Sequence, residues 1–444
     1  MPIDTAMKCG ALTLAALMLA CIVSGQDLPP GILLLSRAEN HVKEELKRLA
    51  GITCLETVQR EVGNSKGPSH DTGQSPKKMR PLDTIRLEVL TNGDQELFAS
   101  PGDRKFSEQP PLTYAGSGML GNGLFGLYLK DILLSGYATT RYKGEEDVAG
   151  RRLARYDYQL SPIFSGQTIE IPEGSGSVGL EGSFWVDPRT YDVIRLELNA
   201  DAIPPSLPIS ALTTSVNYGQ TVLNNQWTVL LPETADVQLV KNSGEISHDQ
   251  VEFTHCRVFG AESTIDFNAS PESQQARFGA VSLDDTLRRL PGGLQVAVKL
   301  RSRVSSDMVV GTLIDGVVAG DVKDKHSVVI PAGSPVRGRI RRMERYTDPF
   351  VYFVVGIEFT EVEVDGIRHI FYADLAGIDR APGVELTLST GNDGVENPRT
   401  VTAVTRERIV VHNLPGVATF FFKGDPLDLP ANFRTVWKTR ALKE

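Results

Sequence analysis

The sequence LEGSFWVDPRTYDVIRLELN (residues 180–199) decides the fold class. Apolar residues dominate Leu180–Val186 and alternate in Val193–Asn199, and Asp187-Pro188 between them is a turn signal. This stretch predicts a strand, an Asp-Pro turn and a returning strand.

Similar strand patterns occupy much of the chain around this hairpin. They are separated by Gly, Pro, Asn and Asp turns and comprise Arg152–Leu160, Thr213–Leu223, Trp227–Pro232, Asp236–Lys241 and Val251–Phe267. Upstream, Asn92-Gly93 joins Asp83–Leu90 to Gln95–Ala99 and predicts another hairpin. Strands in such a series have to wrap a shared core, so the sequence favours a sandwich or an open barrel.

Two helical patterns precede most of the strands. The first carries five apolar residues at helical spacing: Leu35, Ala38, Val42, Leu46 and Leu49. Gly51 ends it, and Thr53–Val62 follows as the first strand. The second pattern covers Gly123–Leu134. Residues 63–81 have no apolar periodicity, so we expect a loop there.

A second β unit is expected near the C-terminus. Residues 268–290 lack strand patterning and include a helix-like stretch at Leu283–Leu290, so we place a linker there. Asp365-Gly366 predicts a tight hairpin beyond it, and alternating strands around this hairpin predict a small β-barrel over residues 291–444. The expected fold class is mainly β with a few helices.

Composition limits the classes of function. The 444 residues include 46 Lys+Arg and 55 Asp+Glu, which gives a formal net charge of -9. Nucleic-acid binders normally carry a strongly basic domain, so this class is nearly excluded. Beyond the N-terminus, no apolar run approaches the roughly 18 residues that span a bilayer.

Residues 1–25 resemble a secretory signal peptide. Lys8 is followed by the apolar stretch Ala11–Val23 and by small or moderate residues before a cleavage site after Gly25. Met18-Leu-Ala-Cys21 also resembles a bacterial lipobox, in which Cys21 would be lipidated and become the first residue. A buried N-terminal helix is the third interpretation. We expect an exported protein, located in the periplasm or on the periplasmic face of the outer membrane.

Export affects the interpretation of the cysteines. Cleavage after Gly25 leaves Cys54 and Cys256, and an even pair in an oxidising compartment suggests a disulfide. Two buried, unpaired cysteines are the alternative.

Motifs of cofactor and metal chemistry are weak. Gly116–Gly121 and Gly121–Gly126 both match the dinucleotide-binding pattern G-x-G-x-x-G, but Pro110-Pro111 precedes them where a buried strand would be needed. His248, Glu252, His255 and Cys256 are close in sequence, but His255 would point away on a strand. We expect no cofactor, no metal and no enzymatic activity.

An arginine-rich strand is the strongest electrostatic feature. Arg337, Arg339 and Arg341 share one strand face, which we expect to face water. This face is a candidate for contact with anionic lipid, glycan or an acidic partner. The alternative is a solubilising edge face with charged neighbours such as Glu344.

Residues 28–267 resemble the LolA, LolB and RseB-type envelope proteins. The resemblance rests on the helix leading into a strand and on Gly182–Arg195. It implies an unclosed β half-barrel, plugged by the N-terminal helix and apolar on its concave face. Arg48–Arg60 and His255–Phe259 are similar to exported proteins of unknown function from Acidobacteria-type bacteria, in which a helix runs into a cysteine strand.

Residues 291–444 resemble, more weakly, the β-barrel of TrbI-type secretion components. Leu290–Gly293, Val304–Asp307 and Ile330–Ile340 carry this similarity. No Pro-rich linker or membrane anchor accompanies it, so a channel role does not carry over.

The sequence supports two hypotheses of function. The first is a non-enzymatic cell-envelope binding protein whose half-barrel holds a lipid, a lipoprotein or another apolar ligand. The alternative is an envelope assembly or scaffold protein whose second barrel docks to other envelope proteins.

Overall fold

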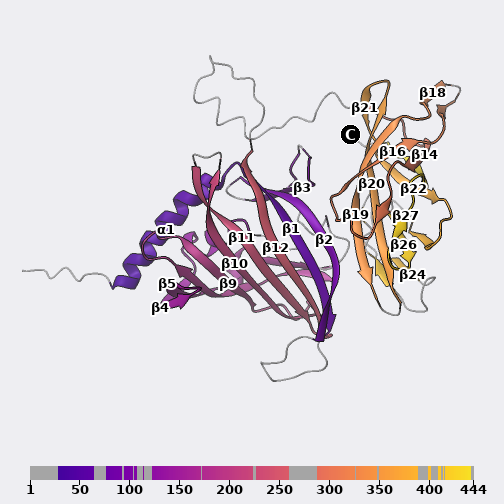
Figure 1. Ribbon diagram of the computed structural model, residues 1–444. Helices are drawn as coiled ribbons and strands as arrows, with labels where there is room; N and C mark the ends of the chain where they lie inside the picture. Colours follow the sequence, from indigo (N-terminus) through magenta and orange to yellow (C-terminus); the bar gives the residue numbers. More distant parts are fainter. Residues whose placement is uncertain are drawn as a thin grey trace, which may run out of the picture.

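The computed structural model describes most of the chain after residue 28. The described ranges are 29–64, 77–92, 95–103, 105–107, 114, 123–171, 173–223, 227–259, 288–325, 327–347, 350–388, 399–401, 409–411, 414 and 416–441. Within them the protein is mainly β with few helices, and its first large sheet is an open, curled half-barrel, as predicted (Figure 1). The expected signal peptide with Cys21, and residues 268–287 of the expected linker, lie outside the described residues.

The first unit runs from Pro30 to Val258. Its helical segments are α1 (Pro30–Leu49), α2 (Leu127–Leu129), η2 (Lys130–Leu134) and α3 (Pro162–Ser165). Its strands are β1 (Ile52–Asn64), β2 (Lys77–Thr91), β3 (Glu96–Ala99), β4 (Thr139–Val148), β5 (Arg151–Leu160), β6 (Thr168–Ile171), β7 (Gly174–Ser177), β8 (Gly179–Val186), β9 (Val193–Asp201), β10 (Ile209–Leu223), β11 (Trp227–Lys241) and β12 (Glu245–Val258).

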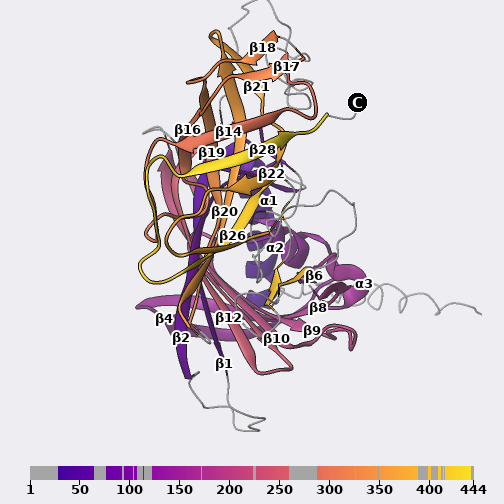
Figure 2. The ribbon, with the colours of Figure 1, turned by 90° about the vertical axis from the view of Figure 1, so that its right-hand side faces the viewer.

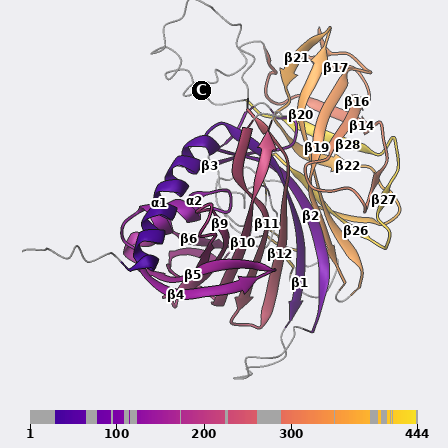
Figure 3. The same ribbon diagram turned by 60° about the vertical axis from the view of Figure 1, so that its left-hand side comes forward.

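Ten of these strands form one antiparallel sheet in the order β3-β2-β1-β12-β11-β10-β9-β8-β5-β4. The order starts at β3 and ends at β4, so the sheet has two edges and stays open. Helix α1 contacts β4, β11 and η2, and Figure 3 shows it lying across one side of the curled sheet. The predicted plug by the N-terminal helix is therefore present.

Several local predictions are corrected. The hairpin at residues 180–199 is confirmed as β8 and β9, whereas the helix expected over Gly123–Leu134 is confined to the short α2 and η2. Strand β2 already begins at Lys77, inside the expected loop. Strand β4 was not predicted, because it is half exposed and charged and therefore lacks an apolar alternation.

The disulfide Cys54–Cys256 is present and joins β1 to β12 across 202 residues of sequence. Its Cα atoms lie 4.0 Å apart, slightly closer than the usual lower end of about 4.4 Å. The two strands are also neighbours in the sheet, so the bond fastens the N-terminal strand to the last strand of the first unit.

The second unit is a smaller β structure. Its strands are β13 (Arg288–Arg289), β14 (Gln295–Leu300), β15 (Val304–Ser305), β16 (Leu313–Val318), β17 (Val322–Asp324), β18 (Ser327–Ile330), β19 (Pro335–Tyr346), β20 (Tyr352–Val364), β21 (Ile367–Ile370), β22 (Ala373–Ile378), β23 (Val384–Leu388), β24 (Arg399–Val401), β25 (Ile409–Val411), β26 (Ala418–Lys423), β27 (Asp428–Leu429) and β28 (Arg434–Thr439). The sheet branches at β20, which pairs with β19, β21 and β26. Arg288 and Arg289 pair with β21, so the helix expected there is wrong for these two residues.

The two units share backbone hydrogen bonds. The amide of Val310 donates to the carbonyl of Thr84 at 2.9 Å, and the amide of Arg86 donates to the carbonyl of Val310 at 3.0 Å. Strand β3 pairs only with residues 88–91 of β2. The second unit therefore covers part of the β2 edge that β3 leaves open, which removes unpaired backbone groups from this edge.

Buried charges reinforce this contact. Arg60 binds Asp83 through two hydrogen bonds of 2.6 Å, and both side chains are almost completely buried. In the second unit Arg342 pairs with the fully buried Glu344 at 2.8 Å. Burial alone would raise the pKa of Glu344, but Arg342 and, from the first unit, Arg60 hold it below its usual value. The two buried pairs therefore interact across the interface.

Candidate functional site

The concave face of the half-barrel carries a continuous apolar row. One buried residue from each of eight adjacent strands contributes to it, and consecutive members are cross-strand partners: Ile85, Val58, Val251, Ala235, Val216, Leu196, Phe184 and Tyr156. The hydroxyl of Tyr156 donates to the carbonyl of Gly31 in α1 at 2.7 Å. Helix α1 therefore lies over this face.

Helix α1 contributes its apolar stripe to the cover of this face, together with the α2 and η2 segments that it packs against. Ala38, Val42 and Leu49 are at most 3% exposed, whereas Leu35 and Leu46 are partly buried against the same core. Gly51, with a φ of 84°, separates the helix from β1. Few residues other than glycine adopt this φ easily. The backbone of Gly51 is also fixed to the sheet, since its amide donates to the carbonyl of Thr91 at 3.3 Å and its carbonyl accepts from the amide of Phe259 at 2.7 Å.

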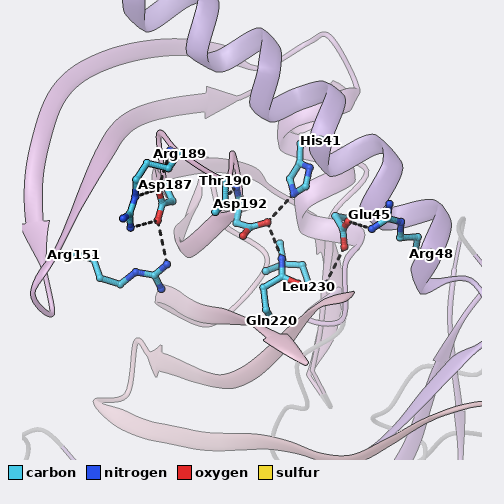
Figure 4. A network of polar contacts seen from close by, with 10 residues as sticks. All are labelled: His41, Glu45, Arg48, Arg151, Asp187, Arg189, Thr190, Asp192, Gln220 and Leu230. Carbon is cyan, nitrogen blue, oxygen red and sulfur yellow. Dashed lines mark hydrogen bonds and ion pairs between the residues drawn. The ribbon is translucent and has the colours of Figure 1, made fainter. Parts of the chain in front are cut away.

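Polar contacts fasten the middle of α1 to the sheet, as Figure 4 shows. His41 Nε2 lies 2.7 Å from Asp192 Oδ1, and the same carboxylate oxygen accepts a hydrogen bond of 3.0 Å from Gln220. One turn later, the buried Glu45 accepts a hydrogen bond of 3.0 Å from the backbone amide of Leu230. We call the contacts made by His41 and Glu45 the α1 latch.

The turn between β8 and β9, from Asp187 to Asp192, also contacts helix α1. Asp192 ends this turn, and Arg37 of α1 donates to the hydroxyl of Tyr191 at 3.0 Å. Asp187 organises the turn by accepting hydrogen bonds from the backbone and side chain of Arg189. Burial opposes the ionised form, but these bonds and Arg151 hold the pKa of Asp187 below its usual value. The turn that begins at Asp187-Pro188 thus positions the carboxylate of Asp192 for its contact with His41 of α1.

The glycine-rich motif has an internal partner. The amides of Gly123 and Phe125 donate to the two carboxylate oxygens of Glu96 at 2.7 and 2.8 Å. Two of the backbone donors that could have bound a phosphate are therefore occupied by a side chain of the protein itself. The first copy of the motif, Gly116–Gly121, lies outside the described residues.

Buried acids and a tyrosine make part of the interior polar. Burial and the neighbouring Glu96 and Asp249 raise the pKa of Glu56 to about 8. Burial also raises the pKa of Glu96 to about 7, although the backbone amides oppose this shift. The Tyr218 hydroxyl is buried without a hydrogen-bond partner among the described residues. Sequence reasoning missed these groups, because an acid within a strand pattern is normally assigned to the exposed face.

The arginine face is mostly covered. Only Arg337 is well exposed; Arg339 is 6% exposed and its Nη2 lies 2.5 Å from Asp103 of the first unit. Arg341 pairs with Glu358 at 2.6 Å and lies over the ring of Tyr114. The prediction that all three face water is therefore wrong.

The alternative interpretation of this strand is wrong as well. Strand β19 lies between β16 and β20 rather than at an edge, and Glu344 is fully buried. The expectation fails because the first unit covers this face, which an alternating pattern cannot reveal.

The residues weighed for a metal site do not form one. Within the described ranges, no group of three or more His, Cys, Asp and Glu residues is placed to hold a metal ion. Cys256 is bonded to Cys54, and His248 instead contacts Asp236 at 2.7 Å. No described helix is long and apolar enough to cross a membrane.

Comparisons with known proteins find several solved structures with a weak likeness to this chain. Neither a family model nor a curated protein matches. A lipoprotein-sorting protein domain from Vibrio parahaemolyticus is 10% identical, with 53% of this chain and 97% of that chain covered and a TM-score of 0.27. A DUF1329 family protein from Desulfovibrio piger is 10% identical. The match covers 52% of this chain and 95% of that chain, with a TM-score of 0.26. A LolA superfamily protein from Nitrosomonas europaea is 11% identical. The match covers 50% of this chain and 94% of that chain, with a TM-score of 0.25. At these TM-scores the likenesses carry no argument about function.

Proposed function

We propose that the protein is a non-enzymatic binding protein of the bacterial cell envelope. Its first domain, residues 28–267, would take up the acyl chain of a lipid or lipoprotein on the concave face. The second domain, residues 291–444, would stay docked to the β2 edge. Residues 1–25 would direct export, with the mature chain beginning at Gln26 or at a lipidated Cys21.

One observation carries this proposal: an open sheet covers its apolar concave row with an amphipathic helix. A filled barrel core built by strands alone would have to unfold to admit a ligand. Here the covering stripe of Ala38, Val42 and Leu49 occupies the position that an acyl chain would take. An apolar ligand can replace this stripe because burial of either surface is stabilised in the same non-directional way.

The strength of the α1 latch fits a cover that moves. His41 is partly exposed, and the contact with Asp192 is an ion pair only when the imidazole is protonated. A hydrogen bond to a charged group contributes about 1.5–3 kcal/mol. The latch can therefore bias the closed state by a few kcal/mol, an amount that ligand binding can overcome.

We expect His41→Ala to increase the affinity for an acyl probe. Loss of the latch contact lowers the cost of displacing α1 by about 1.5–3 kcal/mol, so the dissociation constant of a fluorescent fatty acid should fall roughly ten- to a hundredfold, since 1.4 kcal/mol is a factor of ten. Titration of the probe against wild type and variant measures this change. The matched control is Lys47→Ala, which removes an exposed pair with Glu44 on the same helix.

The alternative function is an envelope scaffold. The observation that favours it is the docking of the second unit, through the backbone hydrogen bonds of Val310 and next to the buried Arg342–Glu344 pair of β19. A scaffold would keep α1 closed permanently. Failure of both wild type and His41→Ala to bind the acyl probe would favour the scaffold and contradict the binding proposal.

A further inference from the structure

The most exposed large apolar side chain of the described residues is at the tip of α3. Ile163 is 87% exposed, and its neighbour Phe164 is 49% exposed. The ring of Phe164 stacks on Tyr137 with centroids 4.3 Å apart, and Tyr137 is itself 59% exposed. We call Tyr137, Ile163 and Phe164 the α3 tip. Figure 2 shows α3 at the outer side of the first unit, beside β6 and β8.

This tip does not stabilise the fold by burial, but its backbone is held firmly. The buried Ser165 hydroxyl donates to the carbonyl of Val178 at 2.5 Å and accepts from the amide of Gln167 at 3.1 Å. The short helix is therefore fixed on the sheet, while its apolar side chains point to solvent. An exposed apolar cluster on a firmly held segment is typical of a surface that contacts a protein, a membrane or a ligand.

The sequence around the tip favours a lipid surface as its partner. Residues 132–140 and 158–169, the two segments that meet at the tip, contain no Asp, Glu, Lys, Arg or His. The nearest charges along the chain are Asp131, Arg141, Asp157 and Glu170. An exposed Ile163 beside the stacked pair of Tyr137 and Phe164, in chain segments that contain no charged residue, suits insertion into the headgroup region of a bilayer. A protein partner would normally be matched by a polar rim.

The start of α1 lies at the same edge of the sheet. Helix α1 packs against β4, where a Cβ at Gly31 would meet the ring of Tyr142, and Ile32 and Leu33 are 52% and 42% exposed. Cys21 precedes Pro29 by eight residues. At roughly 3.3–3.6 Å per residue, a lipid on Cys21 would hold this edge within about 29 Å of a bilayer. The start of α1 and the α3 tip therefore belong to one side of the molecule.

We propose that the α3 tip is a membrane-docking site that inserts Ile163 and Phe164 into a phospholipid surface. This site does not require the proposed ligand site under α1, so either can fail without the other. Docking at the β4–β5 side would bring the start of α1 to the membrane.

The test measures sedimentation of the full chain with sucrose-loaded phosphatidylcholine vesicles. A Cys21→Ser background removes any acyl anchor. We expect Ile163→Asp to lower the partition coefficient at least tenfold. Leu313→Asp, which changes a 65% exposed residue of the second unit, should leave it unchanged. Phe164→Trp should show a blue shift of its emission on vesicle addition.

The docking proposal would be overturned by no sedimentation of the Cys21→Ser protein, by equal losses in Ile163→Asp and Leu313→Asp, or by binding that Ile163→Asp does not alter. If only vesicles with added phosphatidylglycerol bound the protein, and Ile163→Asp bound as well as its parent, the interaction would be electrostatic and the proposal wrong. The acyl-probe titration is independent of these vesicles and separates this failure from failure of the proposed function.

Discussion

Val42→Asp is expected to destabilise the first unit by roughly 3–5 kcal/mol. Val42 is 1% exposed at the centre of the α1 stripe, so the new carboxylate would be buried without a partner or would force the helix off the sheet. Urea unfolding followed by circular dichroism measures the change in the free energy of unfolding. Ile32→Asp is the control, because Ile32 lies on the same helix and is 52% exposed; it should cost less than about 1 kcal/mol.

Val42→Asp also tests whether α1 covers the concave apolar row or is only a surface helix. If α1 covers the concave row, Val42→Asp should also change binding of the fluorescent fatty acid. A variant that unfolded like wild type and bound the probe identically would show that α1 is a surface element. The acyl-binding proposal would then lose its mechanical basis.

Glu56→Gln is expected to flatten the dependence of stability on pH. The pKa of Glu56 is raised to about 8 in the folded protein, whereas an unfolded glutamate titrates near pH 4.3. Between these values the folded state keeps a proton that the unfolded chain has lost, so stability falls as the pH rises through this window. At 1.36 kcal/mol per pKa unit, the loss attributable to Glu56 is roughly 3–5 kcal/mol by pH 8.5.

Glutamine cannot titrate and resembles the protonated carboxyl in shape, so the variant should be more stable than wild type at pH 8.5. At pH 4.5 the two proteins should unfold alike, which serves as the internal control. Urea unfolding of wild type and Glu56→Gln at both pH values measures the two differences in the free energy of unfolding. Parallel pH profiles for wild type and variant would contradict the placement of Glu56 in a buried, acidic environment.

Sequence patterns predicted the elements whose burial is periodic. The hairpin Leu180–Asn199 and the helix at Leu35–Leu49 are recognisable because one face of each is apolar. The Cys54–Cys256 bond followed from an even cysteine count together with expected export. In contrast, β4 carries charges along most of its length, and the arginines of β19 are paired across an interface that no local pattern records.

The candidate site was only partly predictable for a related reason. The α1 stripe was visible, but the carboxylate that fastens it, Asp192, is 151 residues away from His41 in sequence. Likewise, Glu96 meets the glycine-rich segment through backbone amides, which every residue except proline carries. Contacts of this kind depend on the folded arrangement of distant strands, so a single sequence carries little trace of them.

Hydrogen exchange of the wild-type protein with and without palmitate tests the central claim most directly. The account predicts that saturating ligand speeds the exchange of amides in α1, Pro30–Leu49, because the helix leaves the concave face. The amides of β8 to β11 should stay protected, because the acyl chain takes the place of the helix. Bound palmitate with unchanged or slower exchange throughout α1 would contradict the claim that this helix is displaced by an apolar ligand.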